Sequence, residues 1–423
     1  MEPAHGTVSL KGSHVCIRSH QVCHRPQRGG ACRANAGSDL VRVTLLNKYY
    51  YPPHLGGIET YMSALAEALA GRPGVHVSAI VSNESSATVR EDVAGVDVLR
   101  VARAFAASST PVAFGMARAI GEAARGPLRS DLFHIQFPYP WGDWAWQRAG
   151  CPGPMVLSYH SDIVRQRFLG ALYRPVMQRL LERADRIIVA TPPMIEHSPF
   201  LAPYADKCRL VPYGIRPERY EATPARLDQA ARIRAQHTRP IVLFVGRLIY
   251  YKGVDVLVRA MTGFEADVVL VGSGPLEGEL RELATSLGVA DRLSIVPPLD
   301  DEALTAHFLA ADVFCLPSVA RSEAFGIVQL EAHICGTPVV STNLPTGVPW
   351  VNQDGETGLV VEPGDSVALA SALARLLTDD ALCARLGARA RARVLESFTV
   401  ETMVAGTLSV YDEVLHEGGA RQH

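Results

Sequence analysis

Long apolar runs are absent from this chain of 423 residues: no stretch of 18 or more apolar residues is available to form a membrane-spanning helix. The N-terminal region also lacks the apolar segment of a secretory signal peptide, so we expect a cytoplasmic protein. No C-x-x-C pair occurs among the eight scattered cysteines, which we expect to be reduced thiols. The formal net charge is only −2, so no basic excess indicates nucleic acid as a partner.

The composition that remains is that of a soluble globular protein, with 48% hydrophobic and 20% charged residues. The length calls for two domains. We expect a disordered extension over residues 1–38, which are rich in Gly, Ser, Pro and basic residues. Its His and Cys residues match no zinc-finger spacing. A first domain over 39–213 and a second over 214–399 are predicted to meet at the turn-rich segment 211–217, and a last helix, about 400–415, is predicted to pack back on the first domain.

Short β-rich runs alternate with helical patterns along both halves, which predicts an α/β fold with mainly parallel sheets. The first half carries the runs Val41–Leu46, His76–Val81, Val96–Val101, Leu132–Ile135, Met155–Tyr159, Arg186–Ala190 and Arg209–Val211. The second half carries Ile241–Val245, Asp267–Val271, Leu293–Val296, Val313–Leu316 and Pro338–Ser341. In such sheets ligands bind beyond the carboxyl ends of the strands.

Several polar and glycine-containing loops fall at those strand ends. Gly56 and Gly57 stand between the first strand and its helix, and Gly272-x-Gly274 follows a strand of the second half. Glycines here allow the backbone to approach a ligand. Arg247 and Lys252 lie in one loop, where two cations suit a diphosphate.

Two histidines, His134 and His160, also fall at strand ends. Each has the alternative of a hydrogen-bonded structural residue. His160, which stands beside Asp162, is the better functional candidate. The following stretch, 163–183, is basic and amphipathic, which is typical either of a solvated helix face or of contact with an anionic membrane surface.

The stretch 321–331 places Glu323 and Glu331 eight positions apart, across a turn with Phe325, Gly326 and Ile327. With a helix starting at Phe325-Gly326, a rise of about 1.5 Å per residue puts the carboxylates up to roughly 12 Å apart. That is too far for the paired acids of a glycosidase, at about 5–9.5 Å. It favours one long ligand bound at both ends, near the free N–H groups of a helix start.

Taken together, these motifs resemble the retaining glycosyltransferases of family 4, over roughly residues 40–415. The matching elements, in chain order, are Gly56-Gly57-x-Glu59, Arg247, Lys252, Gly272-x-Gly274, Glu323-x7-Glu331 and Gly355-x-x-Gly358. The resemblance implies a GT-B fold, with two Rossmann-like domains facing across a cleft. It also implies that the first domain takes the acceptor and the second takes the nucleotide sugar.

The resemblance further implies a role for each matched residue. Arg247 and Lys252 would hold the diphosphate, Glu331 the ribose hydroxyls, and Glu323 would face the transferred sugar. The N–H groups of residues 325–327 would contact sugar or phosphate oxygens, and the two N-terminal glycines would close over the diphosphate. His160 would stabilise the transition state. No D-x-D pair is present to bind a metal, so we expect no cofactor and no metal requirement.

One segment departs from many relatives, which carry Gly-Gly followed by Glu after the Pro338–Ser341 strand. Residues 344–352 read Leu-Pro-Thr-Gly-Val-Pro-Trp-Val-Asn instead, as in bacterial mannosyl- and rhamnosyltransferases of surface polysaccharide synthesis. We therefore favour GDP-mannose as donor and a saccharide or lipid-linked saccharide as acceptor, with possible peripheral contact at the inner membrane face. The alternatives are a non-catalytic nucleotide-sugar-binding protein and a GT-B epimerase or phosphorylase. No lysine motif for pyridoxal phosphate is visible for a phosphorylase.

Overall fold

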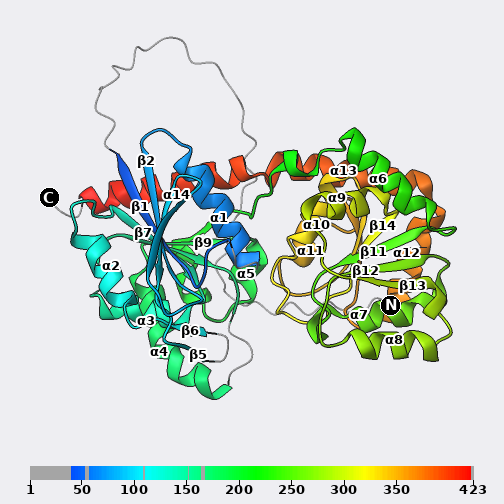
Figure 1. Cartoon of the computed structure of the whole chain (residues 1–423), viewed down its shortest axis with the longest axis horizontal. Helices are drawn as coiled ribbons and strands as arrows, with labels where there is room; N and C mark the ends of the chain where they lie inside the picture. The colour runs from blue at the N-terminus through cyan, green and yellow to red at the C-terminus, as the bar shows by residue number, and fades with distance from the viewer. Residues whose placement is uncertain (1–39, 53–56, 108–109, 151, 163–166, 421–423) are drawn as a thin grey trace, which may run out of the picture. The chain divides into compact units, whose positions relative to one another are not determined.

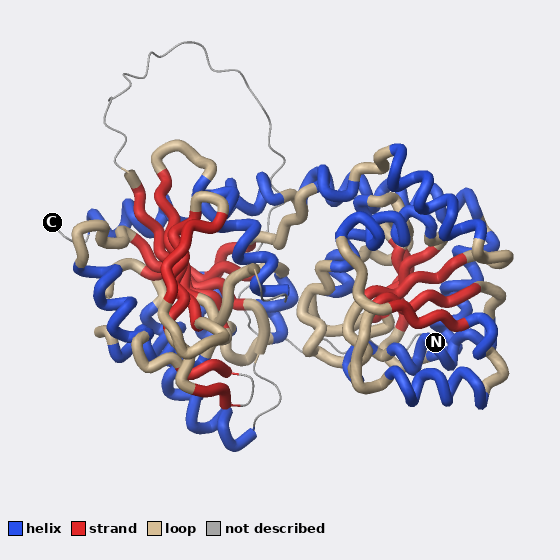
Figure 2. Tube along the Cα trace, in the orientation of Figure 1, coloured by secondary structure: helices blue, strands red, loops and turns tan. Residues whose placement is uncertain are grey.

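The computed structural model describes residues 40–52, 57–107, 110–150, 152–162 and 167–420. The predicted extension over 1–38 and the predicted ligand-contacting Gly56 lie outside these ranges. Two largely parallel sheets, each flanked by helices, make up the described chain (Figures 1 and 2).

The first sheet has eight strands in the spatial order β10-β9-β8-β7-β1-β2-β4-β3, and all neighbours are parallel except β3 and β4. Their bounds are β1 Val41–Leu46, β2 Val75–Ser82, β3 Val89–Val93, β4 Val96–Val101, β7 Leu132–Phe137, β8 Met155–Tyr159, β9 Arg186–Val189 and β10 Cys208–Leu210. A separate hairpin joins β5 Phe105–Ala107 to β6 Thr110–Val112.

The second sheet has six strands in the order β13-β12-β11-β14-β15-β16, all parallel. They are β11 Ile241–Val245, β12 Asp267–Val271, β13 Leu293–Val296, β14 Val313–Leu316, β15 Val339–Thr342 and β16 Gly358–Val361. Numbered within this half, the order is 3-2-1-4-5-6, the doubly wound order of dinucleotide-binding domains. The point where this order reverses lies between β11 and β14, and ligands of such sheets bind there.

Helices cover both faces of each sheet (Figure 2). The α-helices are α1 Gly57–Ala70, α2 Met116–Arg125, α3 Pro140–Arg148, α4 Arg167–Arg183, α5 Pro192–His197, α6 Pro224–Ala235, α7 Val254–Ala260, α8 Glu277–Ser286, α9 Asp301–Ala310, α10 Val328–Ile334, α11 Val348–Val351, α12 Ser366–Thr378, α13 Asp380–Ser397 and α14 Val400–Ala420. The 3₁₀ turns are η1 Ala202–Lys207, η2 Pro217–Tyr220, η3 Tyr250–Lys252, η4 Met261–Gly263 and η5 Ala290–Arg292. No helix in the described part of the chain combines the length and apolar character needed to cross a membrane.

The last helix, α14, packs against α1, β8 and β9 of the first sheet (Figure 1). The hydroxyl of its buried Tyr411 is hydrogen-bonded to His134 Nδ1 at 2.7 Å, and Ser158 Oγ is hydrogen-bonded to His134 Nε2 at 2.7 Å. Both ring nitrogens of His134 are therefore hydrogen-bonded within the fold. The segment before β11 and the start of α14 are also joined, because Ile215 exchanges backbone hydrogen bonds with Phe398 and Val400. The domain boundaries themselves stay a prediction.

The apolar runs predicted most of the strands, because both faces of a parallel strand are buried and its sequence is continuously apolar. All five residues of β8 are buried, for example, and the predicted bounds of this strand are those observed. The antiparallel edge strand β3 was missed. Its sequence, VREDV, is charged and exposed, so an edge strand of this kind gives no apolar signal in the sequence. The same charges protect the edge of the sheet from pairing with another chain.

Candidate functional site

A compact polar cluster lies at the reversal point of the second sheet. Lys252, which ends η3 after β11, places its Nζ 2.5 Å from Oε2 of Glu323, and both side chains are nearly buried. Ser318, which follows β14, donates from Oγ to the same oxygen at 3.0 Å. The two loops touch at Gly253, where a Cβ would collide with the carbonyl oxygen of Pro317. The fold thus brings together the predicted Lys252 and Glu323 and adds Ser318.

Arg247 lies in the same loop after β11 but is exposed. Within the described residues it has no ion-pair partner, and it acts electrostatically on Tyr251 together with Lys252. One cation of the predicted pair is therefore free for a ligand, and the other is held by a carboxylate. An anion that binds here would meet Arg247 directly and would compete with Glu323 for Lys252.

Glu331 lies at a different place from the one that the predicted helix implied. The helix α10 begins at Val328, three residues after the expected start, so only Glu331 is on it. The estimate of carboxylate separation from helical rise therefore does not apply. Gly326 adopts φ +72°, a left-handed conformation, and a Cβ there would approach Leu316 Cδ2 at 2.7 Å. This turn separates the two glutamates, and their side chains therefore have different neighbours.

Tyr220, at the end of η2, is a neighbour of Glu331, because η2 packs against α10 and the Tyr220 hydroxyl lowers the pKa of the Glu331 carboxyl. Burial raises the pKa of the Glu331 carboxyl to about 7, while the Tyr220 hydroxyl and the charge of Arg219 oppose this rise and Asp301 adds to it. Arg219 is itself paired with Asp301 at the start of α9. The carboxyl thus lies in a partly desolvated position, where a hydrogen-bonding ligand gains more than in water.

The turn between the two carboxylates presents unpaired backbone donors. In the chain that the structure describes, the N–H groups of Phe325, Gly326 and Ile327 have no hydrogen-bond acceptor. Phe325 is buried and packs on Tyr213 with ring centroids 4.7 Å apart. These donors fit the predicted contact with sugar or phosphate oxygens, which stays a prediction.

Gly272 and Gly274 have a reason other than the predicted approach of a ligand. A Cβ at Gly272 would collide with the carbonyl oxygen of Gly246, and one at Gly274 with that of Leu248. Backbone hydrogen bonds join the two loops, including Leu248 N–H to Ser273 O at 2.9 Å. These glycines let the loop after β12 support the loop that carries Arg247, and their predicted contact with a ligand stays a prediction.

His160 follows β8 and is buried, with both ring nitrogens occupied. Nδ1 lies 2.5 Å from the Tyr213 hydroxyl, and Nε2 lies 2.8 Å from Oε1 of Gln136. Burial lowers the pKa of the imidazole to about 3, so the ring is neutral near pH 7. Tyr213 also packs on Phe325, which links His160 through one ring to the turn beside Glu323. Of the N-terminal glycine pair, Gly57 is the first residue of α1.

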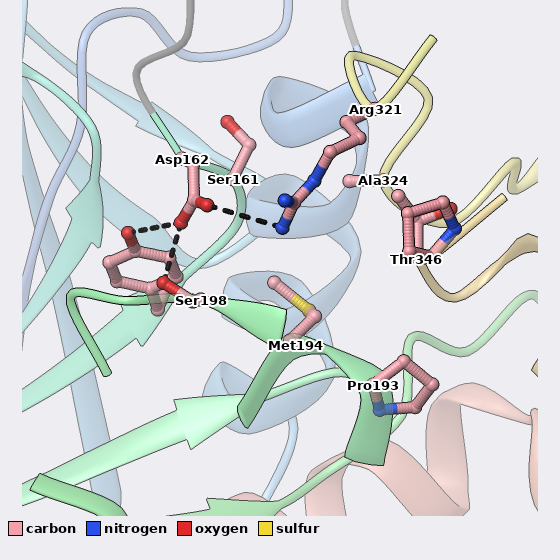
Figure 3. A pocket seen from close by; sticks show the side chains of 10 residues that line it. Ser161, Asp162, Pro193, Met194, Ser198, Arg321, Ala324 and Thr346 are labelled. Atoms are coloured by element: carbon pink, nitrogen blue, oxygen red, sulfur yellow. Dashed lines mark hydrogen bonds and ion pairs between the residues drawn. The ribbon is translucent and has the colours of Figure 1, made fainter. Parts of the chain in front are cut away.

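A pocket lies at the carboxyl ends of β8, β9, β14 and β15 (Figure 3). Asp162 Oδ1 accepts hydrogen bonds from Tyr159 and Ser198, each at 2.7 Å, and Oδ2 lies 3.6 Å from Arg321 Nη2. The other lining residues are Ser161, Pro193, Met194, Ala324, Pro345 and Thr346. The pocket therefore offers one carboxylate, one guanidinium, hydroxyls and short apolar faces.

The departing segment after β15 contributes to this pocket through Pro345 and Thr346. Gly347 donates its N–H to the carbonyl of Ala324 at 2.8 Å, and a Cβ at this position would meet Thr191 Cγ2 at 2.6 Å. Asn352 then ties β15 to β16 by donating to Val339 O, at 3.2 Å, and to Leu359 O, at 3.1 Å. The segment is thus built into the core beside the turn of Glu323.

Sequence reasoning missed the three hydroxyl partners, Ser318, Tyr220 and Tyr213. Ser318 stands five positions before Glu323 at a strand end, a position where the search for ligand groups could have found it. Tyr220 lies in a turn more than a hundred residues before Glu331, and no local spacing connects the two. The structure describes no group of three His, Cys, Asp or Glu residues that could hold a metal ion.

The family models that match the chain are "Glycosyl transferase 4-like domain" over residues 56–214 and "Glycosyl transferases group 1" over residues 226–393. The chain is 34% identical to D-rhamnosyltransferase WbpZ of Pseudomonas aeruginosa over 85% of its length and 92% of that protein. It is 32% identical to O-antigen chain mannosyltransferase C of Escherichia coli over 89% of its length and 99% of that protein.

A third relative is the GDP-mannose-dependent alpha-(1-6)-phosphatidylinositol monomannoside mannosyltransferase of Mycolicibacterium smegmatis, at 30% identity over 83% of this chain and 94% of that protein. Among solved structures, sucrose-phosphate synthase from Thermosynechococcus elongatus superposes with a TM-score of 0.73 at 26% identity, covering 89% of this chain and all of that one. Together with the two doubly wound sheets, this likeness confirms the predicted α/β fold of GT-B type with two Rossmann-like domains.

Proposed function

Because the chain belongs to the group 1 glycosyltransferases, we propose that it moves a hexose, with mannose favoured, from a nucleotide diphosphate sugar to a saccharide or lipid-linked saccharide. That it is a glycosyltransferase follows from its family. The choice of mannose and of a GDP-linked donor rests on relatives that are mannosyl- or rhamnosyltransferases, one of them GDP-mannose-dependent. We propose surface polysaccharide or glycolipid synthesis as the setting, because one relative is an O-antigen enzyme.

The single observation that carries the proposal is the cluster at the reversal point of the second sheet. There the loop after β11 carries the exposed Arg247 and also Lys252, which pairs with Glu323 from the loop after β14. A nucleoside diphosphate gains negative charge as it leaves the sugar, and fixed cations stabilise that charge most in the transition state. In this proposal the diphosphate takes Arg247 and Lys252, and Glu323 is released toward the sugar.

Glu331 binds the ribose in the same proposal, and the N–H groups of residues 325–327 bind oxygens of the sugar or the phosphates. The proposed reaction retains the anomeric configuration. It needs no metal ion, because the two basic side chains neutralise the leaving group. His160 serves as a neutral group, since its pKa is lowered to about 3. For a ring nitrogen to reach the sugar, Tyr213 or Gln136 must give up its hydrogen bond.

We further propose that α4 touches an anionic membrane surface through its arginines. Arg174, Arg179 and Arg183 are exposed, whereas Met177 and Leu180 on the same helix are buried in the protein. The apolar side of this part of α4 is thus already used by the core. Contact with lipid would therefore be electrostatic and would leave the helix at the surface.

The experiment that tests the proposal is a thermal-shift series with GDP-, UDP- and ADP-sugars, followed by measurement of donor hydrolysis without acceptor. A ligand at 100 times its Kd adds about 2.7 kcal/mol to the free energy of unfolding. The preferred nucleotide therefore gives a clear rise in melting temperature. We expect GDP-mannose to stabilise the chain most and to be hydrolysed slowly. A larger shift with a UDP- or ADP-sugar would refute the proposed donor. Binding without any hydrolysis would instead indicate a nucleotide-sugar sensor.

A further inference from the structure

Each of the two glutamates of the E-x7-E motif lies beside one hydroxyl from another part of the chain. Ser318 Oγ donates to Glu323 Oε2 at 3.0 Å. The turn η2, which ends at Tyr220, packs against α10, which carries Glu331, and the Tyr220 hydroxyl stabilises the charged form of the Glu331 carboxyl. Neither hydroxyl belongs to the helix or the turn that carries the glutamates. Each carboxylate is therefore oriented by a residue from a different segment of the chain.

Ser318 is held firmly in place. It is fully buried, and its carbonyl oxygen accepts a hydrogen bond from Thr342 Oγ1 on β15 at 2.6 Å. Both of the contacts of Glu323, from Ser318 and from Lys252, fall on Oε2. In the described chain Oε1 has no partner, so the rotation that Ser318 imposes leaves one carboxylate oxygen available for a ligand.

Tyr220 is held by its neighbours in the segment that leads from the first sheet to the second. Arg219 pairs with Asp301 on α9, and Arg216 pairs with Glu67 on α1 at 3.0 Å. The Tyr220 hydroxyl favours the ionised form of Glu331 against the effect of burial. Without it, more of this carboxyl would carry a proton near pH 7 and would lose acceptor strength.

We propose that Ser318 and Tyr220 are positioning residues for the donor, with Ser318 governing recognition of the transferred sugar and Tyr220 governing recognition of the nucleoside. This inference rests on the proposed function, in which Glu323 faces the sugar and Glu331 the ribose. It adds two residues to the site and divides donor recognition between them. The division can be measured, because GDP has the nucleoside without the sugar.

The test is calorimetric titration of the full chain with GDP and with GDP-mannose. Ser318→Ala should weaken GDP-mannose by about tenfold, the scale of one hydrogen bond to a charged group, and leave GDP unchanged. Tyr220→Phe should weaken both ligands by a similar factor, because both contain the nucleoside. The loss in Tyr220→Phe should be smaller at pH 8 than at pH 6.5, since a higher pH restores the Glu331 charge; the other charged groups that act on Glu331 are Arg219 and Asp301.

Matched controls remove buried hydroxyl contacts elsewhere. Ser341→Ala loses the hydrogen bond from Asn352, at 2.9 Å, and Tyr411→Phe loses that with His134. Both should bind the two ligands as the wild type does. Equal weakening of both ligands in Ser318→Ala, or full GDP affinity in Tyr220→Phe, would overturn the inference while leaving the proposed function intact. A wild-type chain that binds neither ligand would overturn the proposed donor and the inference together.

Discussion

Replacing Glu331 by Gln is expected to make the protein more stable at pH 8 and at the same time weaker in binding the nucleotide. The substitution keeps the shape of the side chain and one acceptor oxygen. It removes only the negative charge. Burial raises the pKa of this carboxyl from its ordinary value of 4.5 to about 7, so at pH 8 the folded chain holds a charge that water would solvate better.

The magnitude and its sign follow from proton linkage. Between pH 4.5 and 7 the folded chain keeps a proton on Glu331 that the unfolded chain has lost, so the free energy of unfolding falls as pH rises. The fall is at most about 3 kcal/mol, at 1.36 kcal/mol per pH step of one. The variant lacks this term. At about pH 4, below both pKa values, the two proteins should melt nearly together. At pH 8 the variant should melt several degrees higher, at about 2–4 °C per kcal/mol.

The assay is scanning calorimetry at several pH values, with Glu279→Gln as the control. Glu279 is exposed on α8 and should give no difference at any pH. The comparison of variant with wild type is essential, because buried Asp143, whose pKa is raised to about 8, titrates in both. A melting difference that is the same at pH 5 and pH 8 would refute the buried titration of Glu331. In the same variant GDP affinity should fall about ten- to a hundredfold; an unchanged affinity would refute the ribose assignment.

Three further predictions concern the rest of the chain. Deleting residues 1–38 should leave the melting temperature and donor turnover nearly unchanged, as the composition of this segment predicts; a large loss of either would contradict this. Donor turnover should survive EDTA, since Arg247 and Lys252 are assigned to the diphosphate, and a loss that Mg²⁺ restores would reject that assignment. Binding to phosphatidylserine vesicles should weaken with salt, and replacing Arg174, Arg179 and Arg183 together by Gln should remove about 1 kcal/mol per residue; vesicle binding that persists in this triple variant would place the contact elsewhere.

The sequence predicted the strands well because apolar periodicity is a local signal. The runs Val96–Val101 and Asp267–Val271 became β4 and β12 with the same ends. Strand ends also located the loops with Lys252 and Glu323, because parallel strands bring their following loops to one edge. What a strand end cannot indicate is which of its side chains touch, and the 2.5 Å contact between these two depends on the neighbouring order of β11 and β14.

Other features of the site depend on distant contacts that no local pattern contains. Tyr220 reaches Glu331 across 111 positions, and His160 meets Tyr213 across 53. A glycine pattern indicates that something approaches the backbone closely, but not whether that neighbour is a ligand or another part of the chain. The pattern Gly272-x-Gly274 was interpreted as a ligand loop for this reason. The structure shows the backbone of residues 246–248 close to these glycines, and their contact with a ligand stays a prediction.

The central claim is that a diphosphate is bound and stabilised at the reversal point of the second sheet, and Arg247→Ala tests it most directly. Arg247 is exposed and has no ion-pair partner among the described residues, so its loss should not disturb the fold. Exposed Arg259 on α7 provides the control, Arg259→Ala. In acceptor-free hydrolysis of GDP-mannose, Arg247→Ala should lower kcat by roughly 10²–10³, the scale of losing one preorganised electrostatic group, while its melting temperature and the Arg259→Ala activity stay at wild-type values. A wild-type kcat in Arg247→Ala would contradict the account.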